Sequence, residues 1–542
     1  MTGDAPTTIR PDGPATGWLA TFPPRRWHLL LASAAVVAVY LAGVTGRWWP
    51  TPDSSLYLGL GWSLAEGGGY WFNGEVCNIV TPGMPWILAG LRLAFGRVFW
   101  APNLFVALCG VAAIGLTYLT VARLAERRTA LAVALATAFS YPFYVNSHKI
   151  LTDAPAVALT WATLYAAVRF HRGGAGWLVA AGVLSAASIT LRAPGLLVYG
   201  PLALGLLLDR DTSPRLGRRL ASAATVGLAA LATGLVFYRW AQAVSADSPP
   251  YVAGTLQSLS AGIVRRLQGF ADGMWQVPFY FTEILTSQKE ALLPIGIAGA
   301  FLCAVGFVSL CRRGKRLAPT ASVLYLVILG FVSSTIGVAP RYLMPVQALF
   351  VWGTFEGLFV TVRWAYRRRG RLLRPAAYLV AATALAAIVI AVSSVRLGRN
   401  AFYYSYLART DRYYKIIRNG WFDELFAVAD VLAAGRLPNT AALTPGDKAS
   451  ILHFLSGRLT RPQAPTECET ADEADRVYDH VVASDACRIV VVAVADGEEP
   501  FRERLKRRFA DDDRFRHVFW SGRYRVYVRA AAATTSSTRS GG

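Results

Sequence analysis

The chain has 542 residues, of which 54% are hydrophobic, with a mean hydropathy of +0.37 and a formal net charge of +22. Many of its apolar runs approach the length that spans a bilayer, which excludes a large soluble core and indicates a polytopic α-helical membrane protein. The excess arginines fall in short loops between these runs, so they are expected to orient the protein in a membrane and do not indicate nucleic-acid binding.

The N-terminal segment 1–22 is rich in Pro, Gly and Thr and is expected to be disordered. The apolar run 27–48 that follows is longer than the apolar core of a signal peptide. It ends in Arg47-Trp48-Trp49 with no small-residue cleavage site, so it is predicted to be an uncleaved first span. We place the transmembrane domain at 23–398, beginning with this span.

A polar loop at 49–101 follows the first span, and Asp53 lies near its start. Tryptophan prefers the membrane–water interface, so Trp48 and Trp49 place Asp53 only a few residues outside the hydrocarbon. The apolar run after Pro85 is too short to span and favours a re-entrant or interfacial helix. A carboxylate in this position could serve a site where a lipid-linked substrate meets a polar one.

Eleven spans are predicted, and the fifth and sixth come from one apolar block. That block is interrupted at Arg192-Ala193-Pro194-Gly195, where Pro and Gly break the helix. The predicted spans are 27–48, 102–122, 129–146, 152–170, 176–191, 193–209, 219–243, 291–311, 318–338, 343–362 and 374–395.

The arginine-rich loops support this count. With the N-terminus in the cytoplasm, every basic cluster between spans falls on the cytoplasmic side, as the positive-inside rule requires. Reading 176–209 as one span would place several clusters outside, and so would a full span after Pro85. The loops 49–101 and 244–290 and everything after about residue 396 then face outward. The second loop is aromatic-rich and is compatible with helices on the membrane surface or with a plain connection.

Residues 399–530 have the pattern of a small soluble α/β domain on the outer face. Helices are predicted at 422–434, 449–455, 471–482 and 500–508, strands at 441–444 and from Cys487, and a hairpin from 517–520 and 524–528. Cys468 and Cys487 are either a disulfide, if the domain faces an oxidising compartment, or two buried thiols. The tail 531–542 is low in complexity and is expected to be disordered.

Ionisable residues close to spans need partners or water, so they are candidates for function. The topology, which rests on other residues, brings six of them to the outer face: Asp53, His148, Lys149, Asp153, Arg192 and Arg341. This agreement indicates a shared site. Among the six, His148 fits a hydrogen-bonded loop residue better than a catalyst or a ligand.

The other five candidates each have a structural alternative. Asp153, followed by Ala-Pro, could cap a helix, since Asp accepts backbone N–H bonds at that position. Lys149 and Arg341 could reach lipid headgroups as anchors. Arg192 could pair with a carboxylate for structure alone, and Asp53 could form a turn after a proline.

No metal or nucleotide motif is recognisable in the sequence. The chain has no Asp-x-Asp, no His-Glu-x-x-His and no clustered His/Cys set, and Gly67-Gly68-Gly69 lacks the Lys-Ser/Thr of a Walker loop. No cofactor is therefore predicted. A divalent cation is compatible with the chain, but no motif indicates one.

Four segments in order form a wider pattern. They are Asp53…Tyr57…Gly69-Tyr70…Thr81-Pro82-Gly83-Met84-Pro85-Trp86, Leu151-Thr152-Asp153-Ala154-Pro155, Leu191-Arg192-Ala193-Pro194-Gly195 and Arg341-Tyr342-Leu343-Met344-Pro345. Together they resemble the C-type (GT-C) membrane glycosyltransferases, most closely the bacterial branch similar to protein O-mannosyltransferases and to the enzymes that add aminoarabinose to lipid A. Ala449–Arg458 resembles the start of the soluble tail of many members. One departure is that Asp53 is followed by Ser54, whereas the mannosyltransferases have an Asp-Glu pair.

The resemblance implies an inverting glycosyltransferase that moves a sugar from a polyprenyl-phosphate donor to an acceptor hydroxyl on the outer face of a bacterial inner membrane. Asp53 would be the general base. Lys149, Arg192 and Arg341 are our candidates to bind the donor phosphate, because cations stabilise its growing charge. The remaining candidates contribute to substrate binding or to structure: Tyr57, His148, Asp153 and Tyr342.

The expected partners are the lipid-linked donor, membrane lipids and an acceptor that is a protein, a lipid or a glycan. Two alternatives to an enzyme remain open. A transporter or flippase would line a pathway with polar residues through mid-span, whereas here the strongest candidates lie on one face. A non-catalytic GT-C-like protein would bind the lipid-linked sugar without turning it over.

Overall fold

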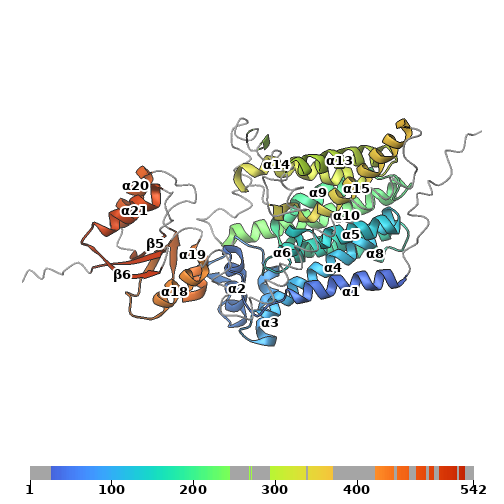
Figure 1. Cartoon of the computed structure of the whole chain (residues 1–542). Coiled ribbons are helices and arrows are strands. Elements are labelled where there is room, and N and C mark those ends of the chain that lie inside the picture. Colours follow the sequence, from blue (N-terminus) through green and yellow to red (C-terminus); the bar gives the residue numbers. More distant parts are fainter. Residues whose placement is uncertain are drawn as a thin grey trace, which may run out of the picture.

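Figure 1 shows the computed structural model, a helical bundle with a mixed α/β part at one end. It describes residues 26–77, 79–244, 268, 270–271, 293–336, 340–369, 421–444, 448–462, 471–483, 487–493, 500–521 and 524–530. The C-terminal part, by which we mean the described residues from 421 onward, lies at the end of the bundle where α2 (Pro52–Ala65) and α3 (Gly83–Phe95) are found.

The bundle is built from long apolar helices and a few shorter ones. Their bounds are α1 (Arg26–Ala42), α4 (Trp100–Leu124), α5 (Arg127–Ala138), α6 (Tyr141–Asn146), α7 (Asp153–Phe170), α8 (Gly176–Leu191), α9 (Leu196–Leu208), α10 (Leu216–Val244), α13 (Leu293–Arg312), α14 (Leu317–Ile336) and α15 (Pro340–Arg369). A two-stranded hairpin, β1 (Trp71–Phe72) and β2 (Glu75–Val76), lies between α2 and α3.

Among the described residues, four helices are both long and apolar enough to cross a membrane: α4, α10, α13 and α15. Their large exposed side chains, such as Leu228 and Phe301, are apolar, as expected of surfaces that face lipid. Several other apolar helices are shorter, including α3, α8 and α9. The chain is therefore a helical membrane protein, and the predicted number of eleven spans remains a prediction.

The predicted break between the fifth and sixth spans is present. Helix α8 ends at Leu191, Arg192 is extended, and a 3₁₀ turn over Ala193–Gly195 leads into α9. Proline lacks a backbone N–H and disfavours helical geometry in the residue before it, so the chain leaves the helix here. At this break the Arg192 side chain contacts Asp153 at the start of α7.

Two predicted spans end or divide earlier than expected. The run 129–146 is two helices, because α5 ends at Ala138 and α6 starts at Tyr141 with Pro142 in its first turn. The first helix stops at Ala42, short of residue 48. There the carbonyl of Tyr40 accepts the N–H of Gly43 and contacts the ring of His148 instead of continuing the i+4 ladder.

The C-terminal part contains a five-stranded sheet in the order β4-β3-β5-β7-β6. Its strands are β3 (Ala441–Thr444), β4 (Thr460–Pro462), β5 (Cys487–Ala493), β6 (Phe515–Ser521) and β7 (Tyr524–Arg529). Strand β3 pairs in parallel with β4 and β5, whereas β5–β7 and β6–β7 are antiparallel. The helices of this part are α18 (Trp421–Ala433), α19 (Ala449–Ser456), α20 (Ala471–Ala483) and α21 (Pro500–Ala510).

Strand β5 is buried on both faces, which explains its continuous apolar run. Ile489 and Val491 belong to a core that continues toward the membrane bundle, and Val490 and Val492 to a second core with α20 and α21. Strand β4 was not predicted, because its three residues, Thr-Arg-Pro, carry no apolar alternation.

Several sequence expectations lie outside the described residues. They concern the N-terminus 1–22, nearly all of the loop 244–290, the eleventh span 374–395, Cys468 of the Cys468–Cys487 pair, and the tail 531–542.

Candidate active site

Asp53 lies in the first turn of α2, where local sequence fixes the start of the helix. Thr51 and Ser54 form a capping box, in which the Ser54 N–H donates to Thr51 Oγ1 and the Thr51 N–H donates to Ser54 Oγ, each over 3.0 Å. The indole N–H of buried Trp48 also donates to Ser54 Oγ, over 2.9 Å. Ser54 is therefore used in holding the helix start, and its neighbour Asp53 is left to reach across to another helix.

That other helix is α15, whose second residue is Arg341. Its Nη1 donates to Asp53 Oδ2 over 2.8 Å, across 288 positions of sequence. The Asp53 side chain is 45% exposed and that of Arg341 29% exposed. The pair is thus open to water or to a ligand on one side, and a competing anion can approach Arg341.

A second ion pair joins Asp153 and Arg192. Arg192 Nη1 donates to Asp153 Oδ1 over 2.6 Å and to Thr152 Oγ1 over 3.3 Å. The Asp153 side chain is only 2% exposed, and its Oδ2 is buried without a hydrogen-bond partner. Asp153 is the first residue of α7 and Thr152 is its N-cap residue, so Asp153 pairs with Arg192 and is not itself the N-cap.

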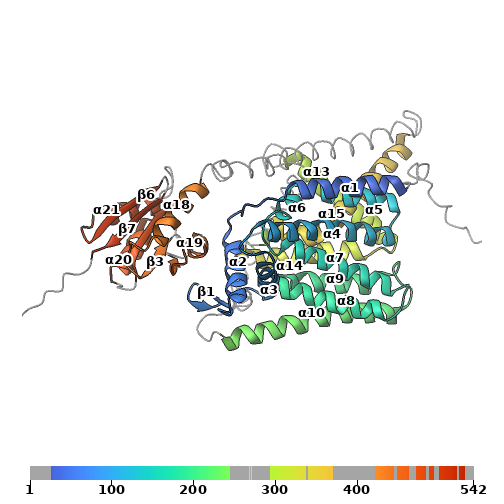
Figure 2. The same cartoon turned by 90° about the horizontal axis from the view of Figure 1, so that it is seen from below.

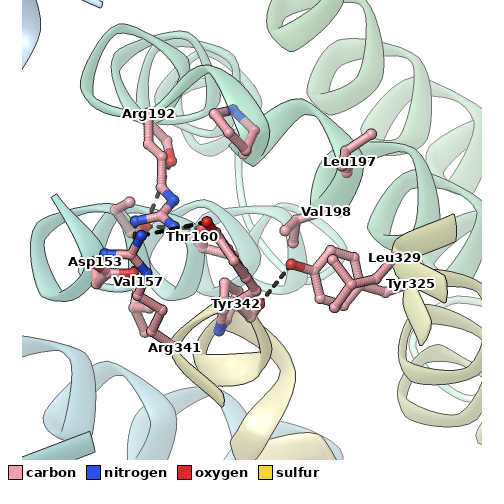
Figure 3. A pocket seen from close by; sticks show the side chains of 15 residues that line it. Asp153, Val157, Thr160, Arg192, Leu197, Val198, Tyr325, Leu329, Arg341 and Tyr342 are labelled. Atoms are coloured by element: carbon pink, nitrogen blue, oxygen red, sulfur yellow. Dashed lines mark hydrogen bonds and ion pairs between the residues drawn. The ribbon is translucent and has the colours of Figure 1, made fainter. Parts of the chain in front are cut away.

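Tyr342 links the two pairs. The guanidinium carbons of Arg192 and Arg341 each lie 5.2 Å from the centre of its ring. Its carbonyl oxygen accepts the hydroxyl of Tyr325 over 2.6 Å, which ties the start of α15 to α14. Figure 3 shows both arginines converging on this ring beside Asp153. Stacking on an aromatic face helps to hold two like charges in one small region.

A cavity lies directly beneath these charges (Figure 3). Its charged end is formed by Asp153, Arg192 and Arg341. The walls below are largely apolar: Val157, Leu197, Val198, Leu329 and Pro345. The cavity volume is about 30 Å³, whereas small-molecule sites usually measure at least ~300 Å³. Side chains must therefore move before a substrate enters.

Tyr57 borders the same region from α2. Its hydroxyl lies 3.5 Å from Thr152 Oγ1, and the side chain is buried. Burial, with a smaller contribution from the negative charge of Asp53, raises the pKa of Tyr57 to about 12. Tyr57 therefore stays protonated at neutral pH and is a hydrogen-bond donor or acceptor, not a base.

The structure places two predicted site residues elsewhere. The Lys149 ammonium lies 5.1 Å from the centre of the Trp49 ring and does not line the cavity. His148 is buried, with Nδ1 2.8 Å from the Tyr144 carbonyl oxygen and Nε2 2.8 Å from that of Tyr40. His148 thus joins α1 to α6, in agreement with its expected role in a hydrogen-bonded loop.

Two residues at the site were missed from the sequence. Thr152 contacts both Arg192 and Tyr57, and Tyr325 holds Tyr342. Tyr325 had a weak signal, since it is a polar-tipped residue inside an apolar run. The structure shows no group of three or more His, Cys, Asp or Glu side chains able to hold a metal ion among the residues that it describes.

Residues 80–249 match the sequence model of the dolichyl-phosphate-mannose-protein mannosyltransferase family. The fold is also similar to that of ArnT from Cupriavidus metallidurans bound to undecaprenyl phosphate. This similarity has a TM-score of 0.57 at 18% identity and covers 96% of this chain and 99% of the other. The chain therefore shares the fold of ArnT, and its residues 80–249 match the mannosyltransferase family model. No curated protein sequence matches it significantly.

A second solved structure has a similar fold. The archaeal oligosaccharyltransferase AglB from Archaeoglobus fulgidus, in complex with an inhibitory peptide and a dolichol-phosphate, matches with a TM-score of 0.55 at 12% identity. The match covers 88% of this chain and 70% of AglB. The segment that matches the family model includes Asp153 and Arg192 but neither Asp53 nor Arg341. The argument for those two residues therefore rests on the geometry described above.

Proposed function

We propose that this GT-C enzyme transfers a sugar from a polyprenyl-phosphate donor to an acceptor hydroxyl, with inversion at the anomeric carbon. One observation carries the proposal. Asp53, Arg192 and Arg341 come from three distant parts of the chain. Yet the two guanidinium groups lie on one tyrosine ring at the charged end of a largely apolar cavity, and the partly exposed carboxylate of Asp53 pairs with Arg341. That arrangement suits a ligand with an anionic head and an apolar tail.

The reaction needs one displacement. The acceptor oxygen attacks the anomeric carbon, Asp53 takes the hydroxyl proton, and the bond from that carbon to the phosphate oxygen breaks. The electron pair leaves with the polyprenyl phosphate, and a single displacement inverts the carbon. General-base assistance of this kind is typically worth about 10²–10⁴ in rate.

Arg192 and Arg341 are assigned to the departing phosphate. Guanidinium groups bind phosphate oxygens through paired N–H donors, and they stabilise the charge that grows on the leaving group. Asp153 holds Arg192 in place through its short contact. Lys149, stacked on Trp49, is assigned to the rim of the site, where its charge attracts anionic headgroups.

In the structure Arg341 is paired with Asp53, so the base and a phosphate-binding cation neutralise each other. The donor phosphate would compete for Arg341, release Asp53 and enlarge the small cavity in one step. Base and donor would then become available together. The lipid ligands named for ArnT and AglB, undecaprenyl phosphate and dolichol-phosphate, support this donor class.

The membrane orientation belongs to the same proposal. The basic loops place the N-terminus in the cytoplasm and give eleven spans, so the site and the C-terminal part would face outward from a bacterial inner membrane. The acceptor is then a protein, lipid or glycan of the outer compartment. A lipid donor and a polar acceptor both reach a site at the membrane edge.

The test is transfer from a panel of polyprenyl-phosphate pentoses and hexoses by the purified protein, compared with Asp53→Asn. We expect Asp53→Asn to transfer about 10²–10⁴-fold more slowly while still binding undecaprenyl phosphate. The matched control is Glu66→Gln at the other end of α2, where the carboxylate pairs with Arg92 and Arg97 away from the cavity. Wild-type transfer by Asp53→Asn would exclude Asp53 as the base, and movement of lipid between leaflets without transfer would indicate a flippase.

A further inference from the structure

Helix α2, which carries Asp53, is held from two sides. On one side it packs against α3 of the bundle, and on the other against α19 of the C-terminal part. Figures 1 and 2 both show α19 beside α2. The helix that presents the proposed base thus depends on a contact from about 400 residues further along the chain.

Phe454 of α19 fills the centre of this contact. Its ring lies 4.9 Å from that of Trp48, edge to face, and 4.9 Å from that of Trp62. Phe99 stacks against the same two indoles at 6.0 and 5.9 Å. We call these four residues the aromatic box. Aromatic pairs at such spacings are favourable beyond the burial of their rings, so the box fixes the position of Trp48.

The position of Trp48 matters because its indole N–H donates to Ser54 Oγ, and Ser54 closes the capping box at the start of α2. Asp53 is the residue next to Ser54. Direct contacts therefore connect Phe454, through Trp48 and Ser54, to the backbone that orients the Asp53 side chain. Loss of the Phe454 ring would let Trp48 and the first turn of α2 shift together.

A second set of contacts holds α19 in place beside α2. In the β1–β2 hairpin, the N–H of Asn73 donates to His453 Nε2 over 2.9 Å. The Asn73 side chain donates to the Thr460 carbonyl over 2.6 Å and accepts the Thr460 N–H over 2.7 Å. The ring of Phe72 lies edge to face on His453 at 4.7 Å and directly over Gly59 of α2, where a Cβ would come within 2.4 Å.

We propose that Phe454 is a positioning residue for the glycosyl transfer: the C-terminal part sets the aim of Asp53 through the aromatic box. This rests on the proposed function of Asp53. Phe454 takes no part in the chemical step. It sets the position of Asp53 through a contact made by the C-terminal part, outside the helical bundle. A displacement of about 1 Å in a reacting group costs up to ~10²-fold in rate, whereas Arg192 and Arg341, which are assigned to the phosphate, belong to other parts of the chain and keep their own contacts with Tyr342.

The experiment compares Phe454→Ala with wild type in the full chain. We expect kcat for transfer to fall about 10–10²-fold, while undecaprenyl phosphate alone binds at least as tightly as it does to wild type, because a displaced Asp53 competes less for Arg341. Phe454→Leu, which keeps most of the packing volume, should recover most of the rate. Trp520→Ala is the matched control, since Trp520 is an aromatic residue of the same C-terminal part that is 63% exposed; it should transfer as wild type does.

Three results would overturn the proposal. They are wild-type kcat in Phe454→Ala, an equal loss in Trp520→Ala, or a parallel loss of undecaprenyl phosphate binding and kcat, which would mean that Phe454 only supports folding. If Phe454→Ala does not fold, Trp48→Phe, which removes the indole N–H that donates to Ser54 Oγ, should lower kcat while undecaprenyl phosphate binding is retained, and wild-type kcat in that variant would overturn the proposal. Failure of wild-type protein to transfer any sugar would instead refute the proposed function, so the two failures are distinguishable.

Discussion

Two aspartates at helix starts have different surroundings and suit different tasks. Asp153 is buried, and one of its oxygens is bound by Arg192, so it resembles a structural counter-ion that holds a cation in place. Asp53 is about half exposed, pairs with Arg341 and can be reached by a substrate. Carboxylates placed in contrasting environments commonly divide roles in this way.

The pairing of Asp53 with Arg341 gives a prediction at the residue scale. Undecaprenyl phosphate should draw Arg341 away, so a carbodiimide with an amine label should modify Asp53 several-fold faster in its presence. This lipid carries no sugar and leaves the space above the phosphate open to the label. Peptide mass spectrometry measures the extent of modification.

Glu66 provides the internal control, because it pairs with Arg92 and Arg97 outside the cavity and its labelling should not change. Arg341→Gln should label rapidly at Asp53 without any lipid. Unchanged labelling of wild-type Asp53 at a lipid concentration that saturates binding would show that donor binding does not separate the pair.

At the scale of elements, the junction between α19 and the β1–β2 hairpin is expected to respond to pH. His453 Nε2 accepts the Asn73 N–H, and its Nδ1–H donates to the Arg458 carbonyl over 2.8 Å, so the contact requires a neutral ring. Burial lowers the pKa of His453 below its ordinary value. The stabilisation is therefore complete above about pH 6.5 and is lost as the pH falls through the lowered value.

We expect wild-type protein to lose about 1 kcal/mol of this contact on acidification, the typical worth of one hydrogen bond. Comparison of Tm at pH 7.5 and pH 5 with that of His453→Gln, which does not titrate, measures it. Wild type should lose more Tm than the variant does. An equal loss in both proteins would remove His453 as the group responsible.

The elements and site residues differ in how far they could be predicted from the sequence. The break at Arg192–Gly195 and strands such as β3 were placed correctly, because Pro, Gly and short apolar runs act locally. Local signals also indicated Arg192 and Arg341 as candidates. They could not show which carboxylate each arginine binds, since those partners lie 39 and 288 positions away.

The differences between the predicted and the observed contacts of individual residues have a similar physical explanation. Lys149 was grouped with the arginines by charge and topology, but its side chain stacks on Trp49, a contact that no local pattern encodes. Tyr325 and Phe454 were missed because their importance comes entirely from distant partners, Tyr342 and Trp48. Ser54 looked like a departure from the related mannosyltransferases, and its use in the capping box became visible only in three dimensions.

For the whole molecule, the membrane topology can be tested by accessibility. Two single cysteines, Glu66→Cys and Gly174→Cys, are separated by three predicted spans and should lie on opposite sides. In a background with all six native cysteines replaced by Ser, a membrane-impermeant maleimide applied to spheroplasts should label position 66. Position 174 should be labelled only after permeabilisation. Labelling of both positions in intact spheroplasts would require a different number of spans.

The contact between Asp53 and Arg341 also bears on how a catalytic cycle ends. After the sugar departs, the spent carrier remains as an anion on the two arginines, and tight holding would stall the next round. Asp53 then competes with the carrier phosphate for Arg341. It can form its ion pair with Arg341 again once it has released to water the proton that it took from the acceptor. We therefore expect the carrier to be a weak product inhibitor, because the protein supplies its own displacing anion.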